Sequence, residues 1–131
     1  MDTDKANLID EDLTAAILAS FYAVYNELGN GFLESVYENA LAIALEEAGF
    51  PVARQVPMQV RFRDRIVGEF RADLVVDDRV LVEVKAVSQL VPAHEVQLVN
   101  YLKGMRIPVG LLLNFGPSPR FKRRIFMPTQ A

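Results

Sequence analysis

Two neighbouring stretches of sequence decide the fold, because each is an apolar strand interrupted by ionisable side chains. They read Phe70-Arg71-Ala72-Asp73-Leu74-Val75-Val76 and Val80-Leu81-Val82-Glu83-Val84-Lys85-Ala86-Val87, and a polar turn, Asp77-Asp78-Arg79, separates them. Such a turn is typical of an antiparallel hairpin. Side chains alternate along a strand, so Glu83 and Lys85 share one face, and the hairpin is expected to bring Asp73 close to both. Two carboxylates and an ammonium on a partly buried surface favour mutual neutralisation or a bound divalent cation.

Length and composition indicate one globular domain spanning residues 1–131. Apolar residues make up 51% of the chain and charged residues 24%, which is an ordinary range for a folded domain. The chain contains no cysteine, which excludes disulfides, thiolate catalysis and thiolate zinc sites. It also has no apolar run near the roughly 20 residues of a membrane helix and no signal-peptide pattern at its N-terminus. We therefore expect a cytoplasmic protein with no membrane contact.

Charge is distributed unevenly along the chain. Residues 1–50 carry ten acidic side chains and one basic one, whereas residues 51–131 carry seven acidic and thirteen basic ones. The basic residues cluster at two places: Arg61, Arg63 and Arg65, and Arg120, Lys122, Arg123 and Arg124. Two interpretations remain open, since these side chains could pair with the acidic N-terminal helices or bind a phosphate backbone.

The order of predicted elements is that of an α/β domain. Apolar periodicity predicts a first helix, capped by Asp10 or Asp12 and running to about Glu27, and a second over residues 33–48, ended by Gly49. Strands are expected over residues 52–63, 66–76 and 80–87, a third helix over 92–105, and a buried strand over 109–115. Residues 120–127 are a possible further edge strand. The resulting order is ααβββαβ with that possible final strand.

The chemistry of the strand residues suits a hard divalent cation. Mg²⁺ prefers oxygen ligands and keeps several waters, so Asp73 and Glu83 could hold it and leave positions for water and a phosphate oxygen. A bound cation lowers the pKa of a coordinated water and polarises a phosphate. Lys85 could orient that water or stabilise developing negative charge.

The same residues resemble the signature of the PD-(D/E)XK nuclease superfamily. Ala72-Asp73, nine residues and then Glu83-Val84-Lys85 match that signature, although Ala72 stands at its proline position. Gly31-Phe32-Leu33-Glu34-Ser35-Val36-Tyr37 is similar to the GxxExxY motif of one small family within the superfamily. The resemblance runs from about Leu28 to Arg124.

This resemblance implies a restriction-endonuclease-like fold, a mixed central β-sheet flanked by helices. It also implies that Asp73 and Glu83 bind Mg²⁺ or Mn²⁺ and that Lys85 is the catalytic lysine. A helix glutamate completes the metal site in related nuclease families, and Glu34 is the matching candidate, although the helix dipole alone favours an acidic residue in a first turn.

Four further positions have both a functional and a structural interpretation. Gln97 and Tyr101 resemble a glutamine–tyrosine element that orders the active site or contacts the strand in nucleases related to recombination exonucleases, but a polar helix stripe can also be a solvent face. Tyr37 could bond a site carboxylate or belong to the core. His94 is the only histidine, and a single histidine is weak evidence for either a metal ligand or a base.

Three functions compete at this point. The first is a metal-dependent nuclease that hydrolyses DNA phosphodiester bonds or, as a less favoured substrate, RNA. The second is a catalytically silent nuclease-fold protein that acts as a self-assembling or interaction module, with a possible homo-oligomer. The third is a nucleic-acid-binding protein without catalysis, for which salt-dependent affinity without cleavage would be typical.

Overall fold

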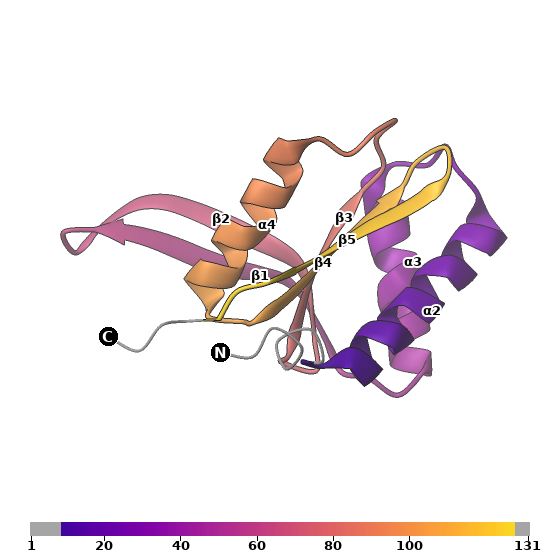
Figure 1. Ribbon diagram of the computed structural model, residues 1–131, viewed down its shortest axis with the longest axis horizontal. Coiled ribbons are helices and arrows are strands. Elements are labelled where there is room, and N and C mark those ends of the chain that lie inside the picture. The colour runs from indigo at the N-terminus through magenta and orange to yellow at the C-terminus, as the bar shows by residue number, and fades with distance from the viewer. Residues whose placement is uncertain (1–8, 128–131) are drawn as a thin grey trace.

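The structure is a computed structural model that describes residues 9–127, and its centre is a mixed five-stranded sheet in the order β1-β2-β3-β4-β5 (Figure 1). Strands β3 and β4 run parallel, and every other neighbouring pair is antiparallel. The elements are α2 (Glu11–Leu28), α3 (Glu34–Glu47), β1 (Val52–Phe62), β2 (Arg65–Val76), β3 (Val80–Lys85), α4 (Pro92–Met105), β4 (Val109–Phe115) and β5 (Pro119–Ile125). The predicted α/β order is confirmed, including the final edge strand.

The helices cover both faces of the sheet. Helices α2 and α3 lie together on one side and α4 lies on the other (Figure 1). The larger core contains Phe21, Leu41 and the strand residues that point toward α2 and α3, such as Val82. The smaller core joins Leu98 and Leu102 of α4 to strand residues that point the other way. Strand β4 is buried along its whole length because both faces are covered, as its uninterrupted apolar sequence predicted.

The turn predicted between the second and third strands is present. Asp77 and Asp78 have φ angles of 51° and 55°, so both adopt the left-handed conformation within the three-residue connection between the paired residues Val76 and Val80. Arg63 and Asp64, with φ angles of 50° and 63°, form a two-residue turn between the paired residues Phe62 and Arg65, which joins β1 to β2. Beyond their contact with the rest of the sheet, β1 and β2 continue as a two-stranded arm, here defined as residues 56–72, which projects from the body of the protein (Figure 1).

The start of α2 differs from the sequence prediction. Asp10 occupies the position before the helix, but its side chain makes no capping hydrogen bond and its φ angle is 52°. Its carboxylate instead accepts a hydrogen bond from Arg79 at 3.0 Å. A charge-assisted pair with an arginine at the β2–β3 turn therefore replaces the expected cap. Within residues 9–127, none of the helices has the length and apolarity to cross a membrane.

Candidate active site

The candidate site lies at a fork in the sheet. Strands β2 and β3 pair only from Val76–Val80 to Leu74–Val82, whereas β3 remains paired with β4 as far as Lys85. The next residues on the two separating strands are Asp73 and Glu83. Because the strands diverge there, the backbone groups at the fork need side-chain partners.

Asp73 and Glu83 supply those partners to each other's strand. The backbone N–H of Asp73 donates to Oε2 of Glu83 at 2.8 Å, and the backbone N–H of Val84 donates to Oδ2 of Asp73 at 2.8 Å. Glu83 is 5% exposed and Asp73 is half-buried. The strand backbones thus fix both carboxyl groups on adjacent strands, side by side, as the hairpin in the sequence implied.

The two carboxyl groups are held where their charge is unfavourable. Burial, followed in size by the neighbouring charge of Asp73, raises the pKa of Glu83 to about 8. Burial also raises the pKa of Asp73 to about 6, and the charge and hydrogen bonding of Glu38 add to that increase. A divalent cation between such groups would favour their ionised forms, so the donor set is suited to Mg²⁺ or Mn²⁺.

Glu38 of α3 is a site residue that the sequence interpretation did not select. Gln55 holds its carboxylate, since the Gln55 side-chain amide donates to both of its oxygens at 2.9 and 3.1 Å. Arg54 contacts it at 3.4 Å. The helical spacing from Glu38 to the buried Leu41 and Leu45 was an available signal, because it places Glu38 on the core-facing stripe of α3.

A local reversal of the strands brings Gln55 to that position. Ala72 belongs to the core under α4, whereas Leu74, two residues further on, belongs to the core under α2 and α3. Residues two apart share a face in a regular strand, so β2 turns over at Asp73. On β1, Gln55 lies at the same level and has a left-handed φ angle of 49°. The distortion of the backbone and the candidate site therefore coincide.

Glu34 is not one of the residues that affect the pKa of Asp73 or Glu83. It is exposed in the first turn of α3, where the helix dipole favours an acidic side chain. Glu38 follows it by one helical turn and is the residue that affects the pKa of both Asp73 and Glu83. Across residues 9–127, no three acidic or histidine side chains are already arranged as a metal cluster. The preformed part of the site is consequently the Asp73–Glu83 pair.

Lys85 extends the same face of β3 beyond Glu83. Its positive charge lowers the pKa of both Asp73 and Glu83, so it lies within electrostatic reach of the pair. Asn114 is the partner of Lys85 on β4, and its side-chain amide bonds the N–H and the carbonyl of Val87, each at 3.0 Å. This double hydrogen bond fixes the chain that leaves β3 just after Lys85.

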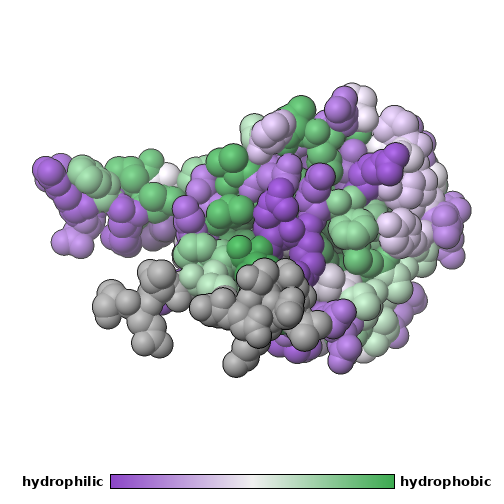
Figure 2. Space-filling model, in the orientation of Figure 1, coloured by the Kyte–Doolittle hydropathy of each residue, from purple (hydrophilic) through white to green (hydrophobic). Residues whose placement is uncertain are grey.

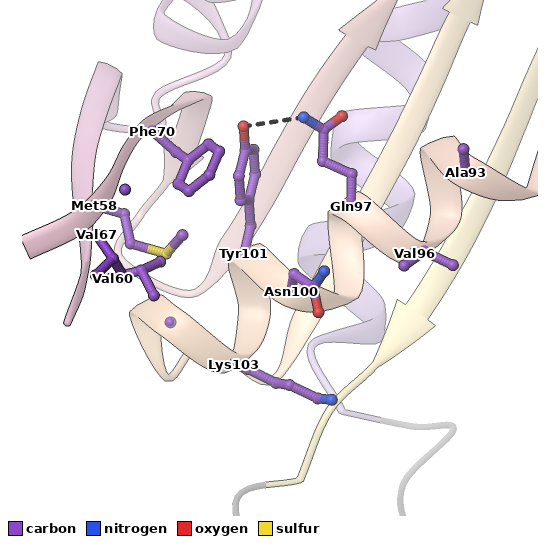
Figure 3. Close-up of a pocket in the computed structure, with 12 residues that line it drawn as sticks. Met58, Val60, Val67, Phe70, Ala93, Val96, Gln97, Asn100, Tyr101 and Lys103 are labelled. Carbon is purple, nitrogen blue, oxygen red and sulfur yellow. Dashed lines mark hydrogen bonds between the residues drawn. The ribbon is translucent and has the colours of Figure 1, made fainter. Parts of the chain in front are cut away.

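Gln97 and Tyr101 approach the pair from α4. The Gln97 side-chain amide donates to the Tyr101 hydroxyl at 3.3 Å (Figure 3). Burial is the main cause of the raised pKa of Tyr101, and the charges of Glu83 and Asp73 raise it further. The structure therefore brings together Asp73, Glu83, Lys85, Gln97 and Tyr101, five of the residues singled out in the sequence.

Comparison with known proteins identifies the family. A family model described as the PD-(D/E)XK nuclease superfamily matches residues 11–125. The chain belongs to the PD-(D/E)XK nuclease superfamily. Its mixed sheet flanked by helices is the restriction-endonuclease-like fold expected from the sequence. Nucleases of this superfamily generally use Mg²⁺ or Mn²⁺.

A solved structure supports the fold of this superfamily member. The structure described as "Crystal structure of SSO0001" is similar over 88% of the present chain, with a TM-score of 0.58 and 16% sequence identity. The likeness covers 58% of that chain, so the present chain spans less than two thirds of its length. At this identity the likeness concerns the fold alone. No curated protein matches the chain.

Two other candidate residues have structural roles in this superfamily member. The Tyr37 hydroxyl donates to the carbonyl of Gly29 and accepts the N–H of Phe32, and its ring stacks on Phe115 at 4.4 Å between centroids. It is fully buried and bonds no site carboxylate, which agrees with the core interpretation. Nδ1 of His94 accepts the backbone N–H of Val91 at 3.1 Å, so His94 caps the start of α4.

Some basic residues pair with acidic side chains of the N-terminal helices, and others remain available to bind a phosphate backbone. Arg54 and Arg79 pair with Glu38 and Asp10 of the N-terminal half. Arg124 instead pairs with Glu95 of α4. Among the described residues, several basic side chains enter no ion pair: Arg61, Arg63, Arg65, Arg120 and Lys122. Pairing with the acidic helices accounts for only part of the basic surface.

Proposed function

We propose that this protein is a metal-dependent nuclease that hydrolyses phosphodiester bonds, with DNA as its substrate. The observation that carries the proposal is the fork itself. There a buried and a half-buried carboxyl group with raised pKa values lie within electrostatic reach of a lysine, in a member of a nuclease superfamily. Asp73 and Glu83 would hold Mg²⁺ or Mn²⁺. The Gly31, Glu34 and Tyr37 pattern further supports placement in the GxxExxY family.

Each residue has a distinct task in the proposed reaction. The cation, when bound, would polarise the phosphate and acidify a water. Lys85 would orient the attacking water and stabilise the charge that develops on the phosphate oxygens. Glu38 of α3 would supply the third carboxylate of the metal site. The sequence interpretation assigned that role to Glu34. Tyr101, oriented by Gln97, would border the site on its α4 side.

The basic surface beside Lys85 supports a nucleic-acid partner. Lys85, Asn114 and Arg120 are successive partners across β3, β4 and β5, so their side chains share the α4 face. Lys122 follows Arg120 on that face and pairs with Leu112, the partner of Glu83. A cavity of about 540 Å³ lies there, lined without any acidic residue by Ser88, Gln89, Leu90, Asn114, Ser118, Arg120, Phe121 and Lys122. Such a surface suits the phosphates of a strand leaving the site.

Cleavage assays test the proposal directly. Purified protein with Mg²⁺ or Mn²⁺ is expected to cut single- or double-stranded DNA, and RNA is tested alongside. Asp73→Asn and Lys85→Met should each abolish cleavage, whereas Arg106→Asn, which removes an exposed positive charge just past the end of α4, should not. Equal cleavage by the wild type and all three variants would trace the activity to a contaminant and overturn the proposal.

A second candidate function is a self-assembling or interaction module, which is a homo-oligomer in its simplest form. Exposed apolar side chains on the arm favour it, notably Phe62 at 59% and Val67 at 61% exposure. Light scattering separates the two functions. A large oligomer whose size is independent of metal, together with no metal binding, would favour the module. A metal-binding monomer or dimer that cleaves DNA would exclude it.

A further inference from the structure

An apolar groove separates the arm from α4. Its volume is about 660 Å³, which is within the range of small-ligand sites. Figure 3 shows it between the arm residues Met58, Val60, Val67 and Phe70 and the exposed side of α4. Along the arm, Figure 2 shows apolar surface alternating with hydrophilic surface. Val67 of the arm and Val96 of α4 both line the groove, and they are 61% and 59% exposed.

The inner end of this groove reaches the candidate active site. Gln97 and Tyr101 line the groove, and Tyr101 belongs to the same buried cluster as Ala72, the neighbour of Asp73. Burial and then the charges of Glu83 and Asp73 raise the pKa of Tyr101, in keeping with that position. The groove and the carboxyl pair are therefore neighbours on the α4 face. Whatever occupies the groove lies beside the position of a phosphate bound at the fork.

The lining has the chemical character that a nucleobase requires. Phe70 and Tyr101 present two aromatic rings with centroids 5.9 Å apart, and Figure 3 shows them side by side. Gln97 and Asn100 add side-chain amides, which can donate to and accept from the edge of a base. Lys103 lies at the rim, and no acidic residue lines the groove. Aromatic stacking, amide hydrogen bonds and a nearby cation are the means by which proteins bind unpaired bases.

The charge around the groove disfavours a second copy of the chain as the occupant. The arm carries Arg61, Arg63, Arg65 and Arg71 against two acidic residues, Asp64 and Glu69. A two-fold interface would place this basic surface against its own copy, and like charges oppose such contact. A phosphate backbone, by contrast, complements both the arm and Lys103.

We propose that the groove binds an unpaired nucleobase adjacent to the scissile phosphate, so that single-stranded or frayed nucleic acid is preferred over a closed duplex. This inference rests on the proposed nuclease function. The base stacks against Phe70 and Tyr101, and the Gln97 and Asn100 amides contact its edge. The strand then continues from the groove across the fork toward Lys85.

Blocking the groove tests this inference. Val96→Trp and Val67→Trp place an indole at two exposed positions of the lining, so the fold should tolerate both. Ile43→Trp on α3 is the matched control, because Ile43 is also 59% exposed and lies outside the groove. The probe is an eight-nucleotide single strand that contains 2-aminopurine, bound in a Lys85→Met background to prevent cleavage, with the corresponding duplex as comparison.

The expected result is a Kd for the single strand that rises about tenfold or more in each blocked variant and stays within about twofold in the control, in line with the stacking of one base. Phe70→Ala should also reduce the quenching of 2-aminopurine fluorescence. Three results would overturn the inference. The first is a single-strand affinity of the blocked variants equal to that of the Ile43→Trp control, and the second is no binding by the protein without an added indole. The third is that the groove variants change only the oligomer size in light scattering.

Failure of the nuclease function gives a different result. If the protein binds the base, the indoles block that binding and no cleavage is seen, the groove assignment stands and the proposed nuclease function is overturned. Cleavage of single strands that is unchanged by Val96→Trp, measured with Lys85 intact, would overturn the groove assignment and leave the nuclease.

Discussion

Asp73 and Glu83 bridge the fork between β2 and β3, because Glu83 accepts the backbone N–H of Asp73 while Asp73 accepts the backbone N–H of Val84. Each carboxyl group thereby replaces a strand partner lost where the sheet opens. The same hydrogen bonds hold two like charges in a buried place, which is costly for the folded protein without a cation. Structure and proposed chemistry therefore depend on the same two side chains.

The first prediction concerns the stability of the metal-free protein against pH. The pKa values of about 6 for Asp73 and about 8 for Glu83 lie above the ordinary 3.8 and 4.5, so the folded state binds more protons than the unfolded state between about pH 4 and 8. Stability is therefore greatest at the acidic end of this window and falls as pH rises through it. Melting temperatures in EDTA from pH 4.5 to 8.5 measure the effect.

Neutral variants locate the source of that pH dependence. Asp73→Asn and Glu83→Gln keep an oxygen acceptor for the backbone N–H groups but remove the charge, so each should flatten the curve. At pH 8 each should raise the free energy of unfolding by on the order of 1 kcal/mol or more. The exposed Glu69→Gln is the control and should leave the slope unchanged. A wild-type melting temperature that rises with pH across this window would contradict the account.

The second prediction distinguishes Glu38 from Glu34. Glu38 is held against Asp73, whereas Glu34 is exposed, so Glu38→Gln should weaken Mn²⁺ binding about tenfold or more and Glu34→Gln should change it less than about twofold. Calorimetric titration at pH 8 measures both affinities. The opposite ranking would establish Glu34 as the helix carboxylate, as the family resemblance implied.

The third prediction concerns Tyr37. Tyr37→Phe keeps the ring stacked on Phe115 but removes the hydroxyl that bonds Gly29 and Phe32. Because the carbonyl and the N–H lose their buried partner, we expect a loss of about 1–3 kcal/mol in the free energy of unfolding and no change in Mn²⁺ affinity. Tyr22→Phe, at a 38% exposed position, is the control for chemical denaturation. A weaker Mn²⁺ site with unchanged stability would instead place Tyr37 in the active site.

Much of the fold followed from local sequence signals. Pro92 opens α4 and residues 92–105 form that helix as predicted, because proline at a first helical position leaves no hydrogen bond unmade. The uninterrupted apolar run of residues 109–115 identified β4, because a strand covered on both faces has no polar side to expose. The Asp77-Asp78 turn brought Asp73 toward Glu83. Each of these signals lies within a few residues of the feature it predicts.

The remaining features depend on partners distant in the sequence. Asp10 fails to cap α2 because Arg79, 69 residues away, takes its carboxylate. Glu38 enters the site because Gln55 on β1 adopts a left-handed conformation and holds it. A left-handed conformation is uncommon for glutamine, so no local sequence pattern predicted this conformation of Gln55. Helical spacing places Glu38 on the core-facing stripe of α3, but the hydrogen bonds from Gln55 that hold its carboxylate depend on the tertiary structure.

The central claim, a metal site at the fork, is tested most directly by calorimetric titration of Mn²⁺ at pH 8 into the wild type and into the double variant Asp73→Asn with Glu83→Gln. The double variant keeps acceptors for the Asp73 and Val84 backbone N–H groups and should remain folded, which its melting temperature verifies. The account predicts binding by the wild type and none by the double variant. Absence of binding by the wild type, or equal binding by both proteins, would contradict it.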